Sequence, residues 1–299
     1  MMGISLDRLI NILVTIALVE MMMLIGFGAT FAELASTARN WRLIARAATA
    51  NYLLVPAVAV ALLALFEASP MFATGFFILA VCPGAPYGPP FAGIAHANVP
   101  AAVGLMVVLA GSSAIVSPAL LHLLLPWVSG GEAPHMDLMA MLMVLLSTQL
   151  LPLLLGLLVK HRRPQLADRL LGPFALVTKV LNLCVAVLIL GSQFHMLMEI
   201  RIKGFVGMLV LLVATLVIGW LAGGPGRDDR RTMALTTSLR NVGVGLVIAT
   251  GNFAGTPAVS ATLAYGIVEV FGSLLVALGW GRRHLTARAT GGPMNNSRR

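Results

Sequence analysis

Long apolar runs recur along the whole chain, and they constrain its fold more than any other feature. A membrane-spanning helix needs about 20 consecutive apolar residues. Nine runs meet that length: residues 9–31, 43–66, 71–94, 99–125, 137–160, 172–192, 202–222, 232–253 and 257–281. Only 10% of the 299 residues are charged, against about 25% in a soluble domain. The sequence therefore predicts an all-α polytopic membrane protein with nine transmembrane helices.

Basic residues are concentrated in alternate connections between these runs. Arg and Lys cluster in residues 39–46, 160–169, 227–231 and 282–299, whereas the intervening connections are poor in them, except for residues 193–203. Because basic loops stay in the cytoplasm, we expect the N-terminus outside and the C-terminus in the cytoplasm. We expect a plasma membrane protein of the bacterial inner-membrane type. Topology thus accounts for the net charge of +9, and no nucleic-acid partner is predicted.

The apolar runs leave no room for a soluble domain. Residues 1–285 are predicted to form one transmembrane domain. Residues 286–299 are short, polar and rich in Gly, Asn and Arg, so we expect a disordered cytoplasmic tail there. The sequence carries no signal for an oligomeric state.

Residues 81–95, with the sequence VCPGAPYGPPFAGIA, interrupt the third run. Proline lacks the N–H that a continuing helix needs, so four prolines within eight residues exclude one straight helix. Non-helical backbone survives at membrane depth only where protein or a water-filled cavity satisfies its polar groups. We therefore expect a broken helix here, with structural breaks at Pro83, Pro86, Pro89 and Pro90.

The eighth run carries a second interruption. Within its sequence RTMALTTSLRNVGVGLVIATGNF, Arg240 and Asn241 lie in mid-span, and Gly243 and Gly245 follow as further candidate breaks. The third and eighth runs are five spans apart, so they cross the membrane in opposite directions. Two such helices, crossing near the midplane at the centre of an inverted repeat, are typical of secondary transporters.

The positions of the two interruptions also predict the repeat itself. Residues 9–125 pair with residues 172–281, and the span at 137–160 is left as an extra helix without a partner. An inverted repeat places the binding site where the two broken helices cross.

Polar side chains near the interruptions are the candidate site residues. Arg240 offers a permanent charge that can bind a carboxylate or sulfate bidentately, and its alternative role is a buried ion pair. Glu269 and Glu20, near the middle of the ninth and first runs, are candidates either to neutralise Arg240 or to carry a coupling proton. The other candidate substrate-binding residues are Asn241, Thr236, Tyr87 and Gly84. Asn182, in the sixth run, is a candidate for an interhelical hydrogen bond or for a substrate contact.

Three motifs resemble those of the bile acid:sodium symporter family. They are Cys82-Pro83-Gly84, the stretch from Ala234-Leu235 to Arg240-Asn241 with the glycines and LVIA that follow, and GFGATFAEL at residues 26–34. The resemblance covers about residues 10–283 and includes the nine-span form that lacks a first helix. It implies a fold with a core and a panel domain, the crossing helices lying in the core. It also implies alternating access that moves an organic anion together with sodium.

The sequence departs from that family at the positions where the resemblance implies sodium ligands. Gly88 and Pro89 stand in place of a Ser-Asn pair, and Thr236 and Arg240 stand in place of a glutamate and a glutamine. A hard cation needs several oxygen ligands, and these residues do not supply them, so no metal site and no cofactor is predicted. Sodium coupling is implied by the resemblance and opposed by the residues. Proton coupling and uncoupled exchange are the alternatives, which leaves Na⁺ and H⁺ as candidate coupling ions.

A membrane enzyme is the alternative class of function. It would need an acid pair, a nucleophile with its base, or a cluster of metal ligands. Ser112, Ser113 and Ser117 share one run, but no histidine is placed to activate them. We therefore predict a transporter rather than an enzyme, with a small organic anion and the lipid bilayer as its partners.

Overall fold

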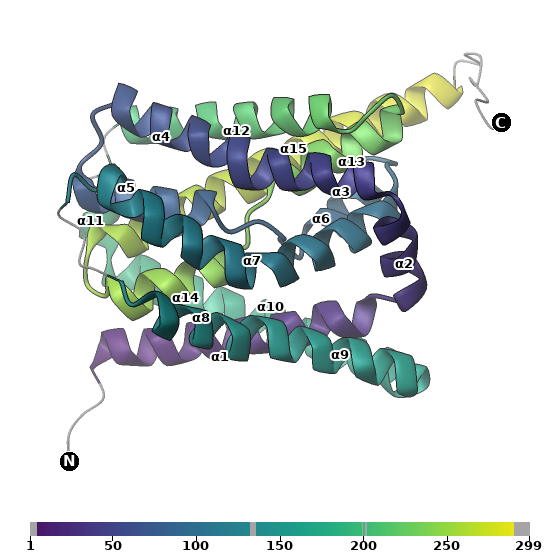
Figure 1. The fold of residues 1–299 in the computed structure, drawn as a ribbon, viewed down its shortest axis with the longest axis horizontal. Helices are drawn as coiled ribbons and strands as arrows, with labels where there is room; N and C mark the ends of the chain where they lie inside the picture. The colour runs from purple at the N-terminus through teal and green to yellow at the C-terminus, as the bar shows by residue number, and fades with distance from the viewer. Residues whose placement is uncertain (1–4, 132–135, 199, 201, 290–299) are drawn as a thin grey trace.

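Long helices run side by side through the molecule in the computed structural model, which describes residues 5–131, 136–198, 200 and 202–289 (Figure 1). Within this described part, seven helical segments are long and apolar enough to span a membrane. They are α1 (Leu6–Gly28), α3 to α4 (Trp41–Leu65), α7 (Val99–Val128), α8 to α9 (Leu138–Arg162), α10 (Pro164–Ser192), α12 (Ile202–Ala222) and α15 (Pro257–Ala289). The prediction of an all-α polytopic membrane protein is confirmed.

The two runs predicted to be interrupted are each built from two short helices. α5 (Pro70–Ala80) and α6 (Gly88–Ile94) are separated by residues 81–87, and α13 (Arg227–Ser238) and α14 (Val242–Asn252) are separated by residues 239–241. Of the expected break residues, Pro83 and Pro86 lie in the first interruption.

The other expected break residues are helical, which corrects that part of the prediction. Pro89 and Pro90 lie in the first turn of α6, where the missing proline N–H costs no helical hydrogen bond. Gly243 and Gly245 lie inside α14. A Cβ at Gly243 would meet the methyl group of Met21, and one at Gly245 would meet the side chain of Leu79. These two glycines therefore let α14 pack closely, and the chain breaks before them.

Some helices extend beyond the expected apolar spans. α10 begins at Pro164, eight residues before the expected start at 172, because a proline at the first position of a helix is preorganised for it. α15 continues to Ala289, so the first residues of the expected tail are helical, and the remainder of that tail lies outside the described residues. The short helix α2 (Phe31–Arg39) was not expected. It starts with a capping box of Thr30 and Glu33, a signal that the sequence does carry.

Two of the long spans contain a π-helical turn, η1 (Ala50–Leu54) and η2 (Leu146–Leu150). Each lies just before a proline, Pro56 or Pro152, whose ring and missing N–H disturb the regular hydrogen-bond ladder. In η2, Gln149 donates to the backbone oxygen of Ala110 (2.5 Å) and to the hydroxyl of Ser113 (2.7 Å). This turn therefore joins the span to α7.

The helices pack in two groups that matter for the site. α1 lies along both α9 and α10, whereas α5 packs on α15 and α12 packs on α13 and α4. In Figure 1, α1, α8, α9 and α10 lie along one side of the molecule. Gly26 of α1 and Gly156 of α9 face each other so closely that a Cβ on either would meet the other's backbone. The division into core and panel domains and the inverted repeat stay predictions.

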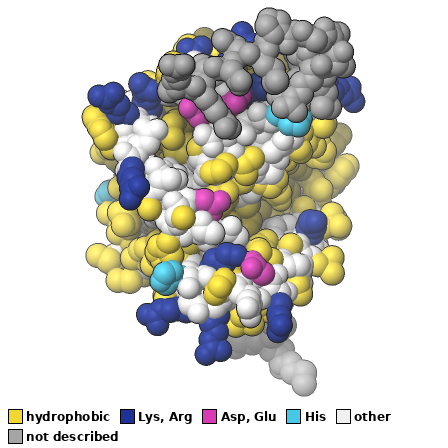
Figure 2. Space-filling model, turned by 90° about the vertical axis from the view of Figure 1, so that its right-hand side faces the viewer, with side chains coloured by type: hydrophobic (Ala, Val, Ile, Leu, Met, Phe, Trp, Pro, Cys, Tyr) yellow, Lys and Arg dark blue, Asp and Glu magenta, His cyan; other side chains and the backbone are white. Residues whose placement is uncertain are grey.

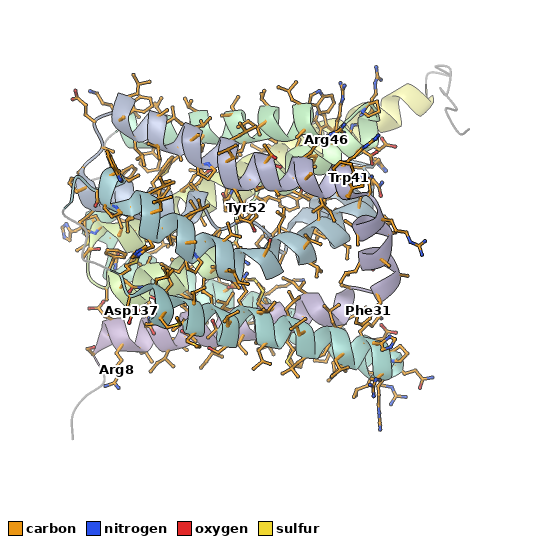
Figure 3. All side chains as sticks on the ribbon, viewed as in Figure 1. Arg8, Phe31, Trp41, Arg46, Tyr52 and Asp137 are labelled. Carbon is orange, nitrogen blue, oxygen red and sulfur yellow. The ribbon has the colours of Figure 1, made fainter. Side chains whose placement is uncertain are left out.

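The ends of the helices differ in charge. Figure 2 looks onto the end of the molecule where α2 lies, and dark-blue Lys and Arg side chains are spread across it. Figure 3 places Trp41 and Arg46 at this end, Arg8 and Asp137 at the opposite end, and Tyr52 between them. Exposed basic residues lie near the end of α2, near the end of α9 and at the start of α13, and they are Arg39, Arg42, Arg46, Arg162, Arg163 and Arg227.

Candidate functional site

The two interruptions cross each other in the interior of the protein. Pro83 and Arg240 form an isolated antiparallel bridge. The backbone N–H of Asn241 donates to the carbonyl oxygen of Cys82 (2.7 Å), and its side-chain amide donates to that of Gly84 (3.4 Å). These bonds satisfy backbone groups that have left a helix, as buried backbone requires. The predicted crossing of the two broken helices is therefore present in the structure.

Arg240 is fully buried at this crossing, with 0% of its surface exposed. Its guanidinium donates to the carbonyl oxygen of Ala80 (3.4 Å) and to that of Thr237. Its backbone N–H donates to Oε1 of Glu269 (2.8 Å). Glu269, on α15, is also fully buried. The structure thus brings these two predicted residues together, with the guanidinium turned to backbone carbonyls.

Three polar atoms near the crossing are buried and have no hydrogen-bond partner among the described residues. They are Nε of Arg240, Oε2 of Glu269 and the hydroxyl of Tyr265. The ring of Tyr265 stacks on that of Phe76 at a centroid distance of 4.9 Å. The sequence reasoning missed Tyr265, although a tyrosine one helical turn before a mid-span glutamate was a usable signal.

Thr236, Asn241 and Gly84 are used to build the crossing. The hydroxyl of Thr236 donates back to the carbonyl oxygen of Thr232 (2.9 Å) within α13. Oδ1 of Asn241 accepts from the N–H of Val244 and so caps α14. Gly84 has a φ of 91°, and a Cβ there would collide with the backbone of Ala110. Substrate contact by these three residues stays a prediction.

We expect Gly84→Ala to destabilise the protein by about 2–4 kcal/mol, through the left-handed backbone and the collision together. Gly131→Ala is the matched control, because Gly131 has a φ of 82° but open space around it. The control should lose only about 1–2 kcal/mol, the cost of the left-handed backbone alone. Thermal unfolding of both variants in the same detergent would measure the difference, and equal losses would show that contact with α7 is unimportant.

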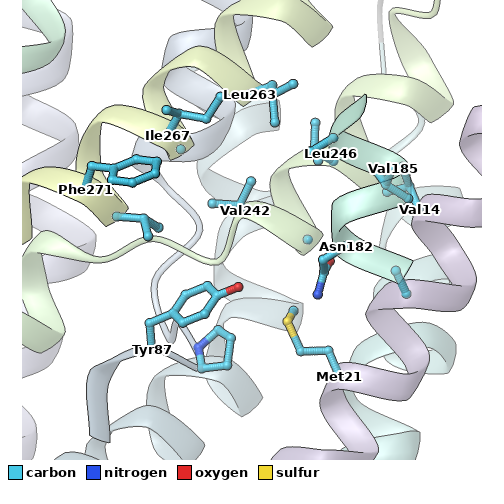
Figure 4. Close-up of a pocket in the computed structure, with 16 residues that line it drawn as sticks. Val14, Met21, Tyr87, Asn182, Val185, Val242, Leu246, Leu263, Ile267 and Phe271 are labelled. Atoms are coloured by element: carbon cyan, nitrogen blue, oxygen red, sulfur yellow. The ribbon is translucent and has the colours of Figure 1, made fainter. Parts of the chain in front are cut away.

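A cavity of about 170 Å³ lies beside the crossing, between α1 and α10 on one side and α14 and α15 on the other. The side chains of Tyr87 and Asn182 project into it (Figure 4). Tyr87 is 38% exposed. Nearly all the other lining side chains are apolar: Val14, Ala17, Met21, Pro86, Val185, Ala186, Val242, Leu246, Leu263, Ile267, Val270 and Phe271. Sequence reasoning found Tyr87 and Asn182 as candidate contacts and Pro86 as a break, but aliphatic lining residues look like any other residues of an apolar span.

A second cavity, of about 570 Å³, lies between α4, α5 and α12. Glu67 and Lys203 are its charged lining residues. It is larger than the first, but no residue of either interruption lines it. We therefore assign the candidate site to the cavity beside the crossing.

Glu20 lies away from the crossing, on α1 next to Thr178 of α10. Both of its carboxylate oxygens are buried, with the hydroxyl of Thr178 beside them. Of the two glutamates, Glu269 is the one that contacts Arg240, through its backbone N–H, and neutralisation of the guanidinium stays a prediction. A role for Glu20 in proton coupling stays a prediction.

The residues at the implied sodium-ligand positions do not fit a sodium ion. Gly88 and Pro89 have no side-chain oxygen, the hydroxyl of Thr236 faces its own helix, and Arg240 brings a positive charge. Within the described part of the chain, no group of three or more His, Cys, Asp or Glu side chains could hold a metal ion.

Comparison with known proteins relates the sequence of this chain to a family. The sequence model of the SBF-like CPA transporter family matches residues 5–269. The chain is 25% identical, over 284 residues, to a protein described as "Probable sodium/metabolite cotransporter BASS2, chloroplastic" from Oryza sativa subsp. japonica. The aligned part is 92% of this chain and 65% of that relative, so the chain spans just under two thirds of the relative's length. Both matches agree with the resemblance seen in the motifs around Cys82 and Arg240.

Proposed function

Because the chain belongs to the SBF-like CPA transporter family, we propose that it is a secondary active transporter of a small organic anion that works by alternating access. The observation that carries the proposal is the cavity beside two crossed broken helices, a site typical of secondary transporters. Transport is the activity of the family, and the substrate class and the mechanism are our inference.

The walls of the cavity belong to two groups of helices, which supports alternating access. α1 and α10 pack on each other and on α9, and they form one wall. The first interruption, α14 and α15 form the other wall. A movement of one group against the other would expose the cavity to one side of the membrane and then to the other.

The lining of the cavity favours an anion with an apolar body. α14 begins beside the cavity, at Val242 and Gly243, and a helix N-terminus attracts negative charge. The hydroxyl of Tyr87 and the amide of Asn182 can donate hydrogen bonds there. The remaining wall is apolar and suits a hydrocarbon or ring system.

The relative's description as a sodium/metabolite cotransporter supports sodium as the driving ion. The residues at the crossing do not fit sodium, and proton coupling through Glu269 or Glu20 and uncoupled exchange are the alternatives. We further propose that the basic end of the molecule faces the cytoplasm and that the N-terminus is outside, in a bacterial plasma membrane. A reporter enzyme that is active on only one side of the membrane, fused to the N-terminus, would test this orientation.

The direct test is a thermal-shift screen of the purified protein, followed by counterflow in proteoliposomes. A ligand that binds only the folded state stabilises it, by about 2.7 kcal/mol at 100 times its dissociation constant. Organic carboxylates and sulfates should raise the melting temperature, and their neutral amides or alcohols should not. The proposal fails if the neutral analogues stabilise equally or if no stabilising anion shows counterflow.

Tyr87→Phe should weaken binding of the stabilising anion about 5- to 10-fold, because it removes one hydrogen bond worth about 1 kcal/mol. Tyr52→Phe is the matched control, since the hydroxyl of Tyr52 contacts Leu109 and Ser112 and does not line the cavity. Isothermal titration of both variants gives the dissociation constants. An unchanged dissociation constant for Tyr87→Phe would show that the hydroxyl does not contact the bound anion.

A further inference from the structure

The guanidinium of Arg240 lies where two helices end. Ala80 is the last residue of α5, and Thr237 is the penultimate residue of α13. The carbonyl oxygens of both accept hydrogen bonds from this one side chain. The last carbonyl groups of any helix have no partner within it. Arg240 therefore caps the C-terminal ends of both first half-helices at once.

The place where the C-terminal ends of α5 and α13 meet attracts a cation for physical reasons. The C-terminal end of a helix carries a partial negative charge, and here two such ends meet. The carboxyl group of Glu269 lies beside them and accepts a hydrogen bond from the backbone N–H of Arg240. Backbone carbonyls of half-helix ends are also the groups that coordinate coupling ions in transporters with broken helices. A cation held there would make these same contacts.

We propose that the guanidinium of Arg240 is a tethered cation, which permanently occupies the cation site at the crossing, so that no sodium ion binds there. This proposal rests on the proposed function only for its consequence, transport that does not depend on sodium. The binding claim itself rests on the burial of Arg240 and on the carbonyl groups that it contacts.

Two features favour a tethered cation over an anchor for substrate. Arg240 is 0% exposed and does not line the cavity. Its hydrogen bonds go to the backbone oxygens of Ala80 and Thr237, and neither residue lines the cavity. The cavity is lined instead by the first residues of α14, Val242 and Gly243. A metal ion that approached these oxygens would be repelled by the guanidinium of Arg240, which already donates hydrogen bonds to them.

Sodium binding can be tested without any substrate. The melting temperature of the purified protein would be measured in NaCl and in choline chloride at equal ionic strength. We expect the same melting temperature in both salts for the wild-type protein. A saturable increase that is specific for sodium would overturn the proposal, and this titration decides the matter even if every variant fails to fold.

Chemical rescue provides the positive test. Arg240→Ala should lower the melting temperature, and millimolar guanidinium chloride, far below denaturing concentrations, should restore part of the loss. Arg42→Ala is the matched control, because Arg42 is exposed and rests on the ring of Trp41, so guanidinium should not rescue it. Equal responses of the two variants to guanidinium would contradict a tethered cation.

Uptake of a stabilising anion into proteoliposomes separates this proposal from the proposed function. Equal uptake with sodium or choline outside supports both. Uptake that requires sodium overturns the tethered cation and leaves a transporter. Absence of uptake in both salts overturns the proposed function, while the sodium titration still decides whether Arg240 replaces the ion.

Discussion

Replacing Arg240 with leucine is expected to destabilise the protein by about 3–5 kcal/mol, because the buried carboxylate of Glu269 loses its compensating charge. The carbonyl groups of Ala80 and Thr237 would lose a donor at the same time. The double variant Arg240→Leu/Glu269→Leu should recover part of the loss, since removing both partners of a buried pair is much less costly than removing one. A double-mutant cycle of unfolding free energies in detergent would measure the coupling.

The exposed ion pair between Lys160 and Asp168 is the control for this cycle. Its side chains are 17% and 58% exposed, and the two atoms are 2.5 Å apart. Exposed pairs contribute only about 0–1 kcal/mol, so Lys160→Leu should have little effect. Additive effects of the two substitutions at Arg240 and Glu269 would mean that the residues do not act as a pair.

The interruptions of the two helices were predictable because proline and clustered polar groups act locally. Pro83 and Pro86 mark the first interruption correctly, although Pro89 and Pro90 belong to the next helix, where proline is favoured at the start. In the eighth run, the sequence pointed to Gly243 and Gly245, but the chain leaves the helix at residues 239–241. The reason is that Asn241 caps α14 and its backbone N–H reaches Cys82, a contact between distant parts of the chain.

The direction of the Arg240 side chain was not predictable. A residue in a non-helical interruption has no helical face, so spacing cannot say whether it points to the cavity or away from it. The structure turns it toward the ends of α5 and α13, and the cavity is lined mostly by aliphatic side chains instead. Which aliphatic residues face a cavity depends on how α1 and α10 meet α14 and α15, and no local pattern encodes that.

Helix ends of both polarities meet at the crossing. The first half-helices, α5 and α13, end at the crossing and present carbonyl oxygens, which Arg240 takes. The second half-helices start there, and α14 presents its N-terminal end to the cavity. Because a helix end favours the opposite charge, the ends of α5 and α13 suit a cation and the start of α14 suits an anion. A cation supplied by the protein leaves only the anion to be carried.

Filling the cavity should stop transport without unfolding the protein. Ala186, on α10, lines the cavity, and Ala186→Trp places an indole inside a space of about 170 Å³. Overpacking a fitted site costs about 1–3 kcal/mol, which corresponds to roughly a 5- to 150-fold loss of affinity for whatever shares the space. We therefore expect uptake of the stabilising anion to fall by at least about fivefold.

Leu183→Trp separates a blocked cavity from a damaged helix. Leu183 lies three residues earlier on the same helix, is 65% exposed and does not line the cavity. Because its side chain points out of the helix group, the same indole there should leave both uptake and melting temperature close to those of the wild type. Proteoliposome uptake and thermal unfolding would be measured side by side. If Ala186→Trp transports normally while folded, the substrate does not pass through this cavity, and the site must lie elsewhere between the helices.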